Sequence, residues 1–178
     1  MGRKVNSGLT TGVKGQTSLE NYDLINILNS QVAAGDISYM RKNEQFNKNI
    51  SKRMDVDPNG VFDVIAHGNH NKIEINVNGK VYMVSWRVLA SSIRKNPEIK
   101  GKSIRLLSCS TGSSDRSFAQ NLANKLNVKV IAPTKYLWAK PDGTYFVAGG
   151  KPNSFGNLVP TESDKGEFKV FYPRRRKK

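Results

Sequence analysis

Two short runs of apolar residues each lead into a residue that could do covalent chemistry. Residues 61–66 precede His67, one of two histidines, and residues 104–108 precede Cys109, the only cysteine. A thiol beside an imidazole makes a nucleophile and its general base, which together can attack an acyl carbon and form a thioester. If the two runs are neighbouring parallel strands, the sequence predicts a Cys109–His67 pair at the carboxyl edge of one sheet.

The residues beside this pair can stabilise the charge that the reaction creates. Gly68 lets a substrate carbonyl approach the backbone, and the amides of Gly68 and Cys109 are candidate donors to the oxyanion of a tetrahedral intermediate. Ser110 is assigned to the same oxyanion and substrate-binding role. A helix amino terminus, expected at residue 115, would favour the thiolate together with the imidazole. The auxiliary candidates are Asn69, His70 and Arg105, with His70 as an alternative base.

Other chemistries draw less support from the same residues. His67, His70 and Cys109 lack a clear fourth ligand and the usual spacing of a zinc site, so the sequence predicts neither a metal nor another cofactor. No pair of carboxylates accompanies the strand ends, as a glycosidase would need. A cysteine after a strand is also frequently a small buried core residue, and a histidine there is frequently a loop residue, so a structural role stays open for both.

The periodicity of apolar residues predicts the elements that hold these side chains. Residues 73–77 alternate between apolar and polar, Asn78 and Gly79 form a two-residue turn, and 81–84 make the returning strand, which predicts a hairpin. The next expected elements are a helix over 85–96, a strand over 103–108, a helix over 115–126 and a strand over 128–132. This succession predicts an α/β fold with a largely parallel central sheet and flanking helices. Ligands of such sheets bind beyond the carboxyl ends of the strands.

The remaining segments divide the chain into three parts. Residues 1–57 are expected to form an amino-terminal arm, with a flexible lead-in over 1–17 and a helix over 18–34. Residues 58–173 are expected to form the α/β catalytic domain. Its carboxy-terminal part should hold a second hairpin over 136–147, a loop-rich stretch over 149–167 and an edge strand over 168–172. Residues 174–178 form a basic tail of arginines and lysines.

The net charge of +15 results from 29 lysines and arginines against 14 aspartates and glutamates. So strong a positive charge favours acidic partners, among them nucleic acid and acidic proteins. A single cysteine excludes an internal disulfide. No apolar stretch approaches the roughly 20 residues that span a bilayer, and the amino terminus lacks a secretory signal. We therefore expect no membrane insertion, and a chain that is cytosolic or delivered as part of something larger.

An apolar strand that ends in His-Gly, a crossover, and an apolar strand that ends in Cys resemble the caspase-like (clan CD) cysteine peptidases. This group includes the self-cleaving protease domains of large bacterial toxins. The resemblance covers residues 61–132 and implies a caspase-like sheet in which His67 is the family's histidine, Gly68 its adjoining glycine and Cys109 its nucleophile. Caspases proper end the second strand in Ala-Cys, where this chain has Ser108, and no downstream specificity loop is identified.

A second resemblance concerns how such a domain would be delivered. Residues 104–112, 118–123 and 130–134, followed by Trp138 and by 141–143, resemble the carboxy-terminal effector domains of bacterial polymorphic toxins. Such domains serve competition between bacteria, are carried into the target-cell cytoplasm by long proteins, and are neutralised by dedicated immunity proteins. The resemblance therefore implies a protein substrate in the target cell and an acidic immunity protein as the partner of this basic chain.

These inferences combine into one expected function and two alternatives. The first is a bacterial toxin effector domain, a cysteine peptidase-like hydrolase that cleaves a peptide or related amide or acyl bond through Cys109 and His67. The second is a basic nuclease toxin in which His67 or His70 acts on RNA or DNA while cations hold phosphate. The cation candidates are Arg105, Arg116, Lys135 and Lys140. The third is a non-enzymatic module that binds nucleic acid through its basic surface.

Overall fold

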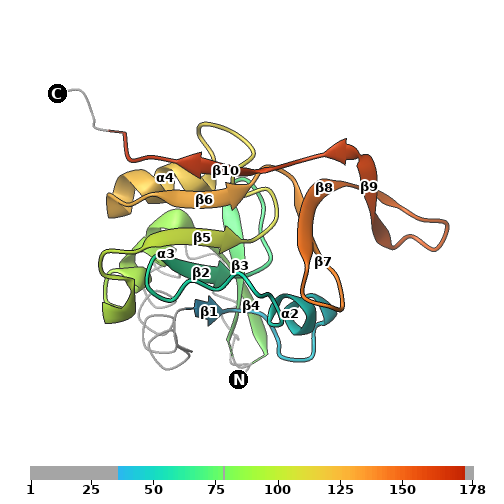
Figure 1. Ribbon diagram of the computed structural model, residues 1–178, viewed down its shortest axis with the longest axis horizontal. Coiled ribbons are helices and arrows are strands. Elements are labelled where there is room, and N and C mark those ends of the chain that lie inside the picture. The colour runs from blue at the N-terminus through green and yellow to red at the C-terminus, as the bar shows by residue number, and fades with distance from the viewer. Residues whose placement is uncertain (1–35, 78, 175–178) are drawn as a thin grey trace, which may run out of the picture.

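The computed structural model describes residues 36–77 and 79–174 (Figure 1). The expected lead-in over 1–17, the expected helix over 18–34 and residues 175–178 of the basic tail lie outside the described residues. The described part is a mixed α/β protein in which strands predominate and the main sheet is partly parallel. None of its described helices is both long and apolar enough to cross a membrane.

The main sheet has the strand order β1-β2-β5-β6-β10. Its members are β1 (Asp36–Ser38), β2 (Val61–Ile65), β5 (Ser103–Leu107), β6 (Val130–Pro133) and β10 (Phe168–Phe171). The first four strands run parallel, and β10 pairs with β6 in the antiparallel direction. The central strands are almost wholly apolar because helices or other strands cover both of their faces. The predicted α/β class is therefore confirmed, with a partly parallel main sheet.

One face of the main sheet carries the larger hydrophobic core. It is covered by α3 (Trp86–Ile93), α4 (Phe118–Leu126) and the hairpin of β3 (Lys72–Val77) and β4 (Lys80–Ser85). The short 3₁₀ helix η1 (Pro97–Ile99) follows α3. Side chains of α3 and α4 pack on Phe62, Val64, Ile104 and Leu106, all fully buried. The predicted first hairpin and both predicted helices are therefore present, although both helices are shorter than expected.

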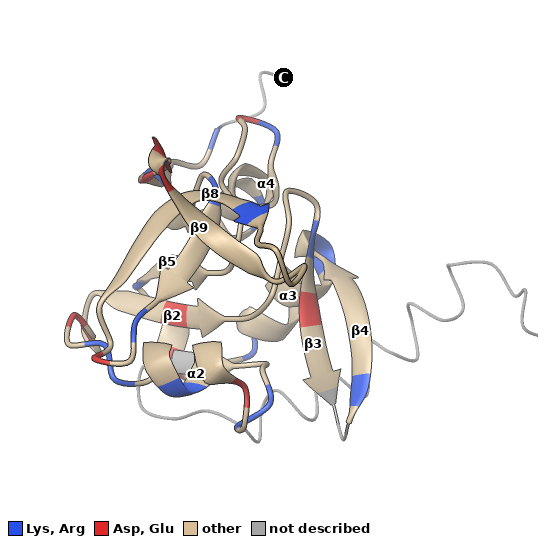
Figure 2. Cartoon of the chain, turned by 90° about the vertical axis from the view of Figure 1, so that its right-hand side faces the viewer, with Lys and Arg blue, Asp and Glu red and all other residues tan. Residues whose placement is uncertain are grey.

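The opposite face is covered by a second, smaller layer. This layer consists of α2 (Gln45–Ile50) and an antiparallel sheet of β7 (Tyr136–Ala139), β8 (Tyr145–Pro152) and β9 (Leu158–Lys165). Seen from that side, α2 lies below β2, and β8 and β9 lie above it (Figure 2). The core residues of this layer are Met40, Ile50, Ile65, Leu107, Leu137 and Val147. The main sheet therefore lies between two apolar layers.

Residues 149–167, expected to be loop-rich, instead hold the end of β8 and all of β9. The expectation was wrong because this stretch contains glycines and prolines, which are uncommon inside strands. Gly150 and Pro160 are paired across the β8–β9 ladder, which is irregular between Ala148 and Gly149. Proline is tolerated in β9 because β9 is the edge strand of its sheet.

Residues 36–57, assigned by the sequence to the amino-terminal arm, supply an edge strand and a helix. Ile37 lies opposite Val64 in the parallel β1–β2 ladder, and the Tyr39 amide donates to the Ile65 carbonyl over 2.9 Å. Ile50 of α2 is fully buried. The polar composition of α2 conceals this role, because its buried positions include asparagines. The side-chain amide of Asn49 donates to the Ala139 carbonyl of β7 over 2.8 Å.

Candidate functional site

The two apolar runs that precede His67 and Cys109 are neighbouring parallel strands, as predicted. Their last paired positions are Ile65 of β2 and Leu107 of β5, and each candidate residue follows two positions later. Because side chains alternate along strands, His67 and Cys109 leave the sheet on the face that α2 and β7 cover. The contacts agree for Cys109, which is partly buried and packs against the core of that layer. Both side chains therefore lie at one edge and on one face of the main sheet.

The Cys109 thiol is held by the backbone of β7. Its Sγ accepts a hydrogen bond from the Leu137 amide over 3.4 Å, and the thiol donates to the Leu137 carbonyl over 3.9 Å. Burial raises the pKa of the thiol, and the Leu137 amide offsets that rise only in part. The expectation of a favoured thiolate is wrong for this conformation, because the side chain is desolvated and the following helix begins only at Phe118.

The buried thiol should make the protein less stable at alkaline pH. The folded chain keeps this proton where the unfolded chain has lost it, so the free energy of unfolding should decrease as the pH rises above about 8.5. In Cys109→Ala, the decrease in the free energy of unfolding that comes from the thiol should be absent. Urea denaturation of both proteins between pH 7 and 10 measures the difference, and equal pH slopes would show that the thiol is not desolvated.

The His67 imidazole is paired with a carboxylate that the sequence analysis did not single out. Its Nε2 lies 2.5 Å from Glu44 Oε2, and the His67 side chain is half-exposed. The ring also lies near Phe46, with 6.5 Å between the ring centroids. Burial alone would raise the pKa of Glu44, but hydrogen bonds from His67 and from the Arg41 amide lower it below its ordinary value. Glu44 therefore faces His67 as a carboxylate.

Glu44 precedes the first residue of α2 and lies 23 residues before His67. One signal in the sequence could have found it: Glu44 is the only acidic residue between Asp36 and Asp55, within a lysine-rich stretch. The imidazole and the thiol, in contrast, form no hydrogen bond with each other in the described structure. The site therefore contains a His67–Glu44 pair and a separate thiol that is bonded to Leu137.

The backbone amides of the two candidate oxyanion residues and of Ser110 differ in whether they are already bonded. Gly68 forms an isolated antiparallel bridge with Ile73, in which the flanking residues make the hydrogen bonds and the Gly68 amide makes none. The Cys109 amide likewise donates to no other described residue. The Ser110 amide donates to the Lys135 carbonyl over 2.8 Å. Gly68 and Cys109 thus keep the donors expected of an oxyanion site, whereas the Ser110 amide is already occupied.

Gly68 also sets how closely the two strand ends approach each other. A Cβ atom at this position would lie 2.2 Å from Ser108 Oγ and 3.2 Å from Thr111 Cγ2. Ser108 is fully buried, and its hydroxyl has no hydrogen-bond partner among the described residues. Gly68 and Ser108 are therefore complementary in size, because a side chain at position 68 would overlap the Ser108 hydroxyl.

Gly68→Ala should destabilise the protein by about 1–3 kcal/mol, because the added methyl group overpacks this contact. Ser108→Ala alone should have little effect, since it removes a buried hydroxyl that has no partner. In the double variant, most of the cost of Gly68→Ala should disappear. A double-mutant cycle by chemical denaturation tests this coupling; additive effects would show that Ser108 is not the residue that excludes a side chain at position 68.

The auxiliary candidates Asn69 and His70 shape the loop after β2. The Asn69 side-chain carbonyl accepts from the amides of Asn71 and Lys72 at 2.9 Å, which closes a turn. The His70 carbonyl accepts from the Phe118 amide over 2.8 Å and so anchors the start of α4. The His70 ring is exposed and contacts the Asn71 side chain. Neither side chain forms a hydrogen bond with Cys109 in the described structure.

The third auxiliary candidate, Arg105, belongs to a buried cluster of charges. Its guanidinium donates two hydrogen bonds to Asp63, at 2.6 and 2.7 Å, and others to Asp55 and Tyr145. Burial alone would lower the pKa of Arg105, but the Asp63 carboxylate more than compensates and raises it. Arg53, whose side chain is 2 % exposed, also pairs with Asp63. Arg105 therefore joins β2 to β5 and the second layer, and is not free to bind substrate.

The remaining cations of the nuclease alternative are dispersed. Lys135 pairs with Asp164 of β9, and the Lys140 ammonium lies 5.5 Å from the centre of the Phe146 ring. Arg116 is exposed in the loop before α4. No group of three or more potential metal ligands occurs within residues 36–77 and 79–174.

A comparison with models of known families matches residues 35–147 to the Domain of unknown function (DUF8616). The matched stretch runs from β1 through β7 and includes His67, Cys109 and Glu44. A search of curated proteins returns no match. The matched region therefore contains both the strands that position the candidate pair and the strand that covers the thiol.

Proposed function

We propose that this chain, which belongs to the family of the Domain of unknown function (DUF8616), is a cysteine hydrolase that cleaves peptide or related amide bonds as a toxin effector domain. One observation carries the proposal. The register of β2 and β5 brings His67 and Cys109 to one edge and one face of the sheet, and the amides of Gly68 and Cys109, which follow the same strand ends, donate to no other described residue.

The proposed reaction proceeds through a thioester. His67 takes the proton of the Cys109 thiol, the resulting thiolate forms a bond to the substrate carbonyl carbon, and the carbonyl oxygen, now an oxyanion, accepts hydrogen bonds from the amides of Gly68 and Cys109. The C–N bond then breaks, and His67 gives its proton to the leaving amine. A water molecule, deprotonated by His67, attacks the thioester; the acid product leaves and the Cys109 thiol is restored.

The described conformation requires one change before this chemistry can begin. Cys109 Sγ must leave the Leu137 backbone and turn towards His67, because it now bonds with β7 and lies in an apolar layer. A rotation about χ1 moves a cysteine sulfur between staggered positions without moving the backbone. Catalytic hydrogen bonds are commonly long or absent before substrate binds. We therefore assign the described conformation to a resting form.

The order of elements supports a caspase-like assignment of the fold. The strand before His67 is followed by a hairpin, a helix and then the strand before Cys109, which lies next to the first. The basic charge of the chain supports an acidic partner, and the resemblance to toxin effector domains supplies the remaining parts of the proposal. These parts are an acidic immunity protein as partner, delivery by a larger toxin protein, and a protein substrate in the cytoplasm of the target cell.

The proposal is tested by incubating the full chain with a denatured bacterial proteome and, separately, with total RNA and plasmid DNA. New peptide amino termini should accumulate with the wild type and not with Cys109→Ala, and the nucleic acids should stay intact. Cleavage of RNA or DNA that persists in Cys109→Ala would overturn the proposal in favour of a nuclease. Failure to release any new terminus would also overturn it.

Within the proposed site, Glu44 is a positioning residue for His67. Glu44→Gln keeps an acceptor for the imidazole N–H, whereas Glu44→Ala removes it. The rate at which new termini appear should therefore fall from wild type to Glu44→Gln and again to Glu44→Ala, by about tenfold or more overall. The free energy of unfolding should change by less than about 1 kcal/mol, since the pair is partly exposed. Equal rates in all three proteins would exclude this role.

A further inference from the structure

A pocket of about 370 Å³ lies at the edge of the main sheet opposite to Cys109. Its lining comes from residues 93–97 and 99–101, which precede β5, and from Leu126 and Val128, which precede β6. β5 and β6 run from this edge towards β7, so the pocket and Cys109 lie at opposite ends of β5 (Figure 1). The proposed chemistry uses no residue of this pocket.

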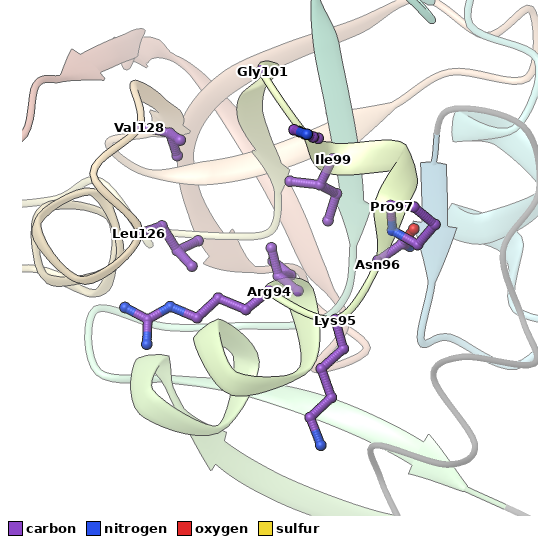
Figure 3. Close-up of a pocket in the computed structure, with 10 residues that line it drawn as sticks. Arg94, Lys95, Asn96, Pro97, Ile99, Gly101, Leu126 and Val128 are labelled. Atoms are coloured by element: carbon purple, nitrogen blue, oxygen red, sulfur yellow. The ribbon is translucent and has the colours of Figure 1, made fainter.

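The interior of the pocket is apolar. Ile93 and Ile99 are almost fully buried there, and Leu126 and Val128 are half-buried on the other side, where the end of α4 leads into β6. Figure 3 shows Ile99 and Leu126 on opposite walls. None of the described residues that line the pocket is aromatic. The pocket therefore fits an aliphatic side chain and offers no ring on which a nucleic-acid base could stack.

The rim of the pocket is strongly positive. Arg94, Lys95 and Lys100 line it, and the Lys95 side chain extends away from the apolar interior (Figure 3). The one acidic residue within 94–102, Glu98, is paired with Lys102 at 3.8 Å. Neither Lys95 nor Lys100 forms an ion pair with a described residue. Such uncompensated charge attracts anionic partners and directs their association.

We propose that this pocket docks an acidic segment of a partner protein, with one aliphatic side chain between Ile99 and Leu126 and carboxylates beside Lys95 and Lys100. An apolar interior with a cationic rim is complementary to such a segment. Because the pocket lies at the far edge of the sheet, a docked partner leaves the Cys109 edge accessible. This docking goes beyond the proposed hydrolase activity and does not depend on it.

The test uses the full chain and two dye-labelled peptides. Both carry aspartates on either side of a central residue, which is leucine in one peptide and serine in the other. By fluorescence anisotropy at physiological ionic strength, the leucine peptide should bind about tenfold more tightly than the serine peptide, because only the leucine side chain gains free energy when it is buried in the apolar interior. Lys95→Glu combined with Lys100→Glu should weaken its binding at least tenfold. The matched control, Lys151→Glu with Lys165→Glu, changes the net charge equally in β8 and β9 and should retain binding.

Several results would overturn the proposal. Equal affinity for both peptides would mean that charge alone attracts them, and equal losses in both double variants would mean that no particular surface is involved. Tighter binding of RNA, with displacement of the leucine peptide, would assign the surface to nucleic acid. Protection of Cys109 from alkylation by the peptide would place binding at the other edge. Val128→Ser, which changes no charge, should also weaken binding of the leucine peptide. It provides a second variant if the charge-reversal variants fail to fold.

Discussion

Growth arrest by the wild-type chain in the bacterial cytoplasm should be abolished by Cys109→Ala, with at least about a 10³-fold gain in surviving colonies. The nucleophile forms the bond that defines the proposed reaction, and removing it leaves only the modest effects of binding and oxyanion stabilisation. His67→Ala should give nearly the same gain, because nucleophile and base act as one unit. Colony counts after induction, with the protein level measured in parallel, check both variants.

The control for this experiment is Ser113→Ala, an exposed residue in the loop after Cys109. It should remain as toxic as the wild type. Since Cys109 lies in the apolar layer beneath β7, alanine should be accommodated there, and circular dichroism should show an unchanged fold. Full toxicity of Cys109→Ala would exclude covalent catalysis by this thiol.

The largest expected loss of stability follows Asp63→Asn. Asp63 accepts hydrogen bonds from Arg53 at 2.8 and 2.9 Å and from Arg105 at 2.6 and 2.7 Å, and it is 1 % exposed. The substitution leaves two arginines without their shared buried carboxylate. Removing one partner of a buried ion pair costs about 3–5 kcal/mol, a large part of the roughly 5–15 kcal/mol that stabilises a domain. Thermal and urea denaturation should show this loss as a lower melting temperature and a lower urea midpoint than in the wild type.

Asp55→Asn provides a matched comparison. Asp55 also accepts a hydrogen bond from Arg105, at 2.6 Å, but half of the Asp55 side chain is exposed. Water can therefore solvate the Arg105 guanidinium when the Asp55 charge is removed. Its substitution should cost about 1 kcal/mol or less. Similar losses for the two variants would mean that the Asp63 cluster is hydrated and does not tie β2 to β5.

The sequence predicts four of the five strands of the main sheet, β2, β5, β6 and β10, because each is a short, mostly apolar run, whereas the short, largely polar β1 was not predicted. The helix before residue 126 is less well predicted: it begins at Phe118 and not at residue 115. The intervening loop is held by contacts that local propensity does not reveal. The Ser110 amide bonds to Lys135, the Gly112 amide bonds to Pro133, and Ser110 adopts a positive φ of 57°.

Two features of the site depend on contacts between distant segments. Glu44 reaches His67 only because β1 and α2 pack beside β2, and the polar sequence of α2 gives no periodic signal for that packing. Leu137 covers the thiol only because the second hairpin folds back over β5, although the hairpin itself is predicted from its turn residues. The sequence thus predicts which strands carry the candidate pair, whereas only the fold shows what surrounds each member.

Covalent capture of Cys109 tests most directly whether this sulfur and the His67 ring work together. The full chain would be incubated at neutral pH with a mixture of peptidyl acyloxymethyl ketones, varied at the residue next to the electrophile, and followed by intact mass. We expect a single adduct on Cys109 that forms at least 100-fold more slowly in His67→Ala. An adduct that forms equally fast without the imidazole, or no adduct in the wild type, would contradict a nucleophile and base that share the edge of β2 and β5.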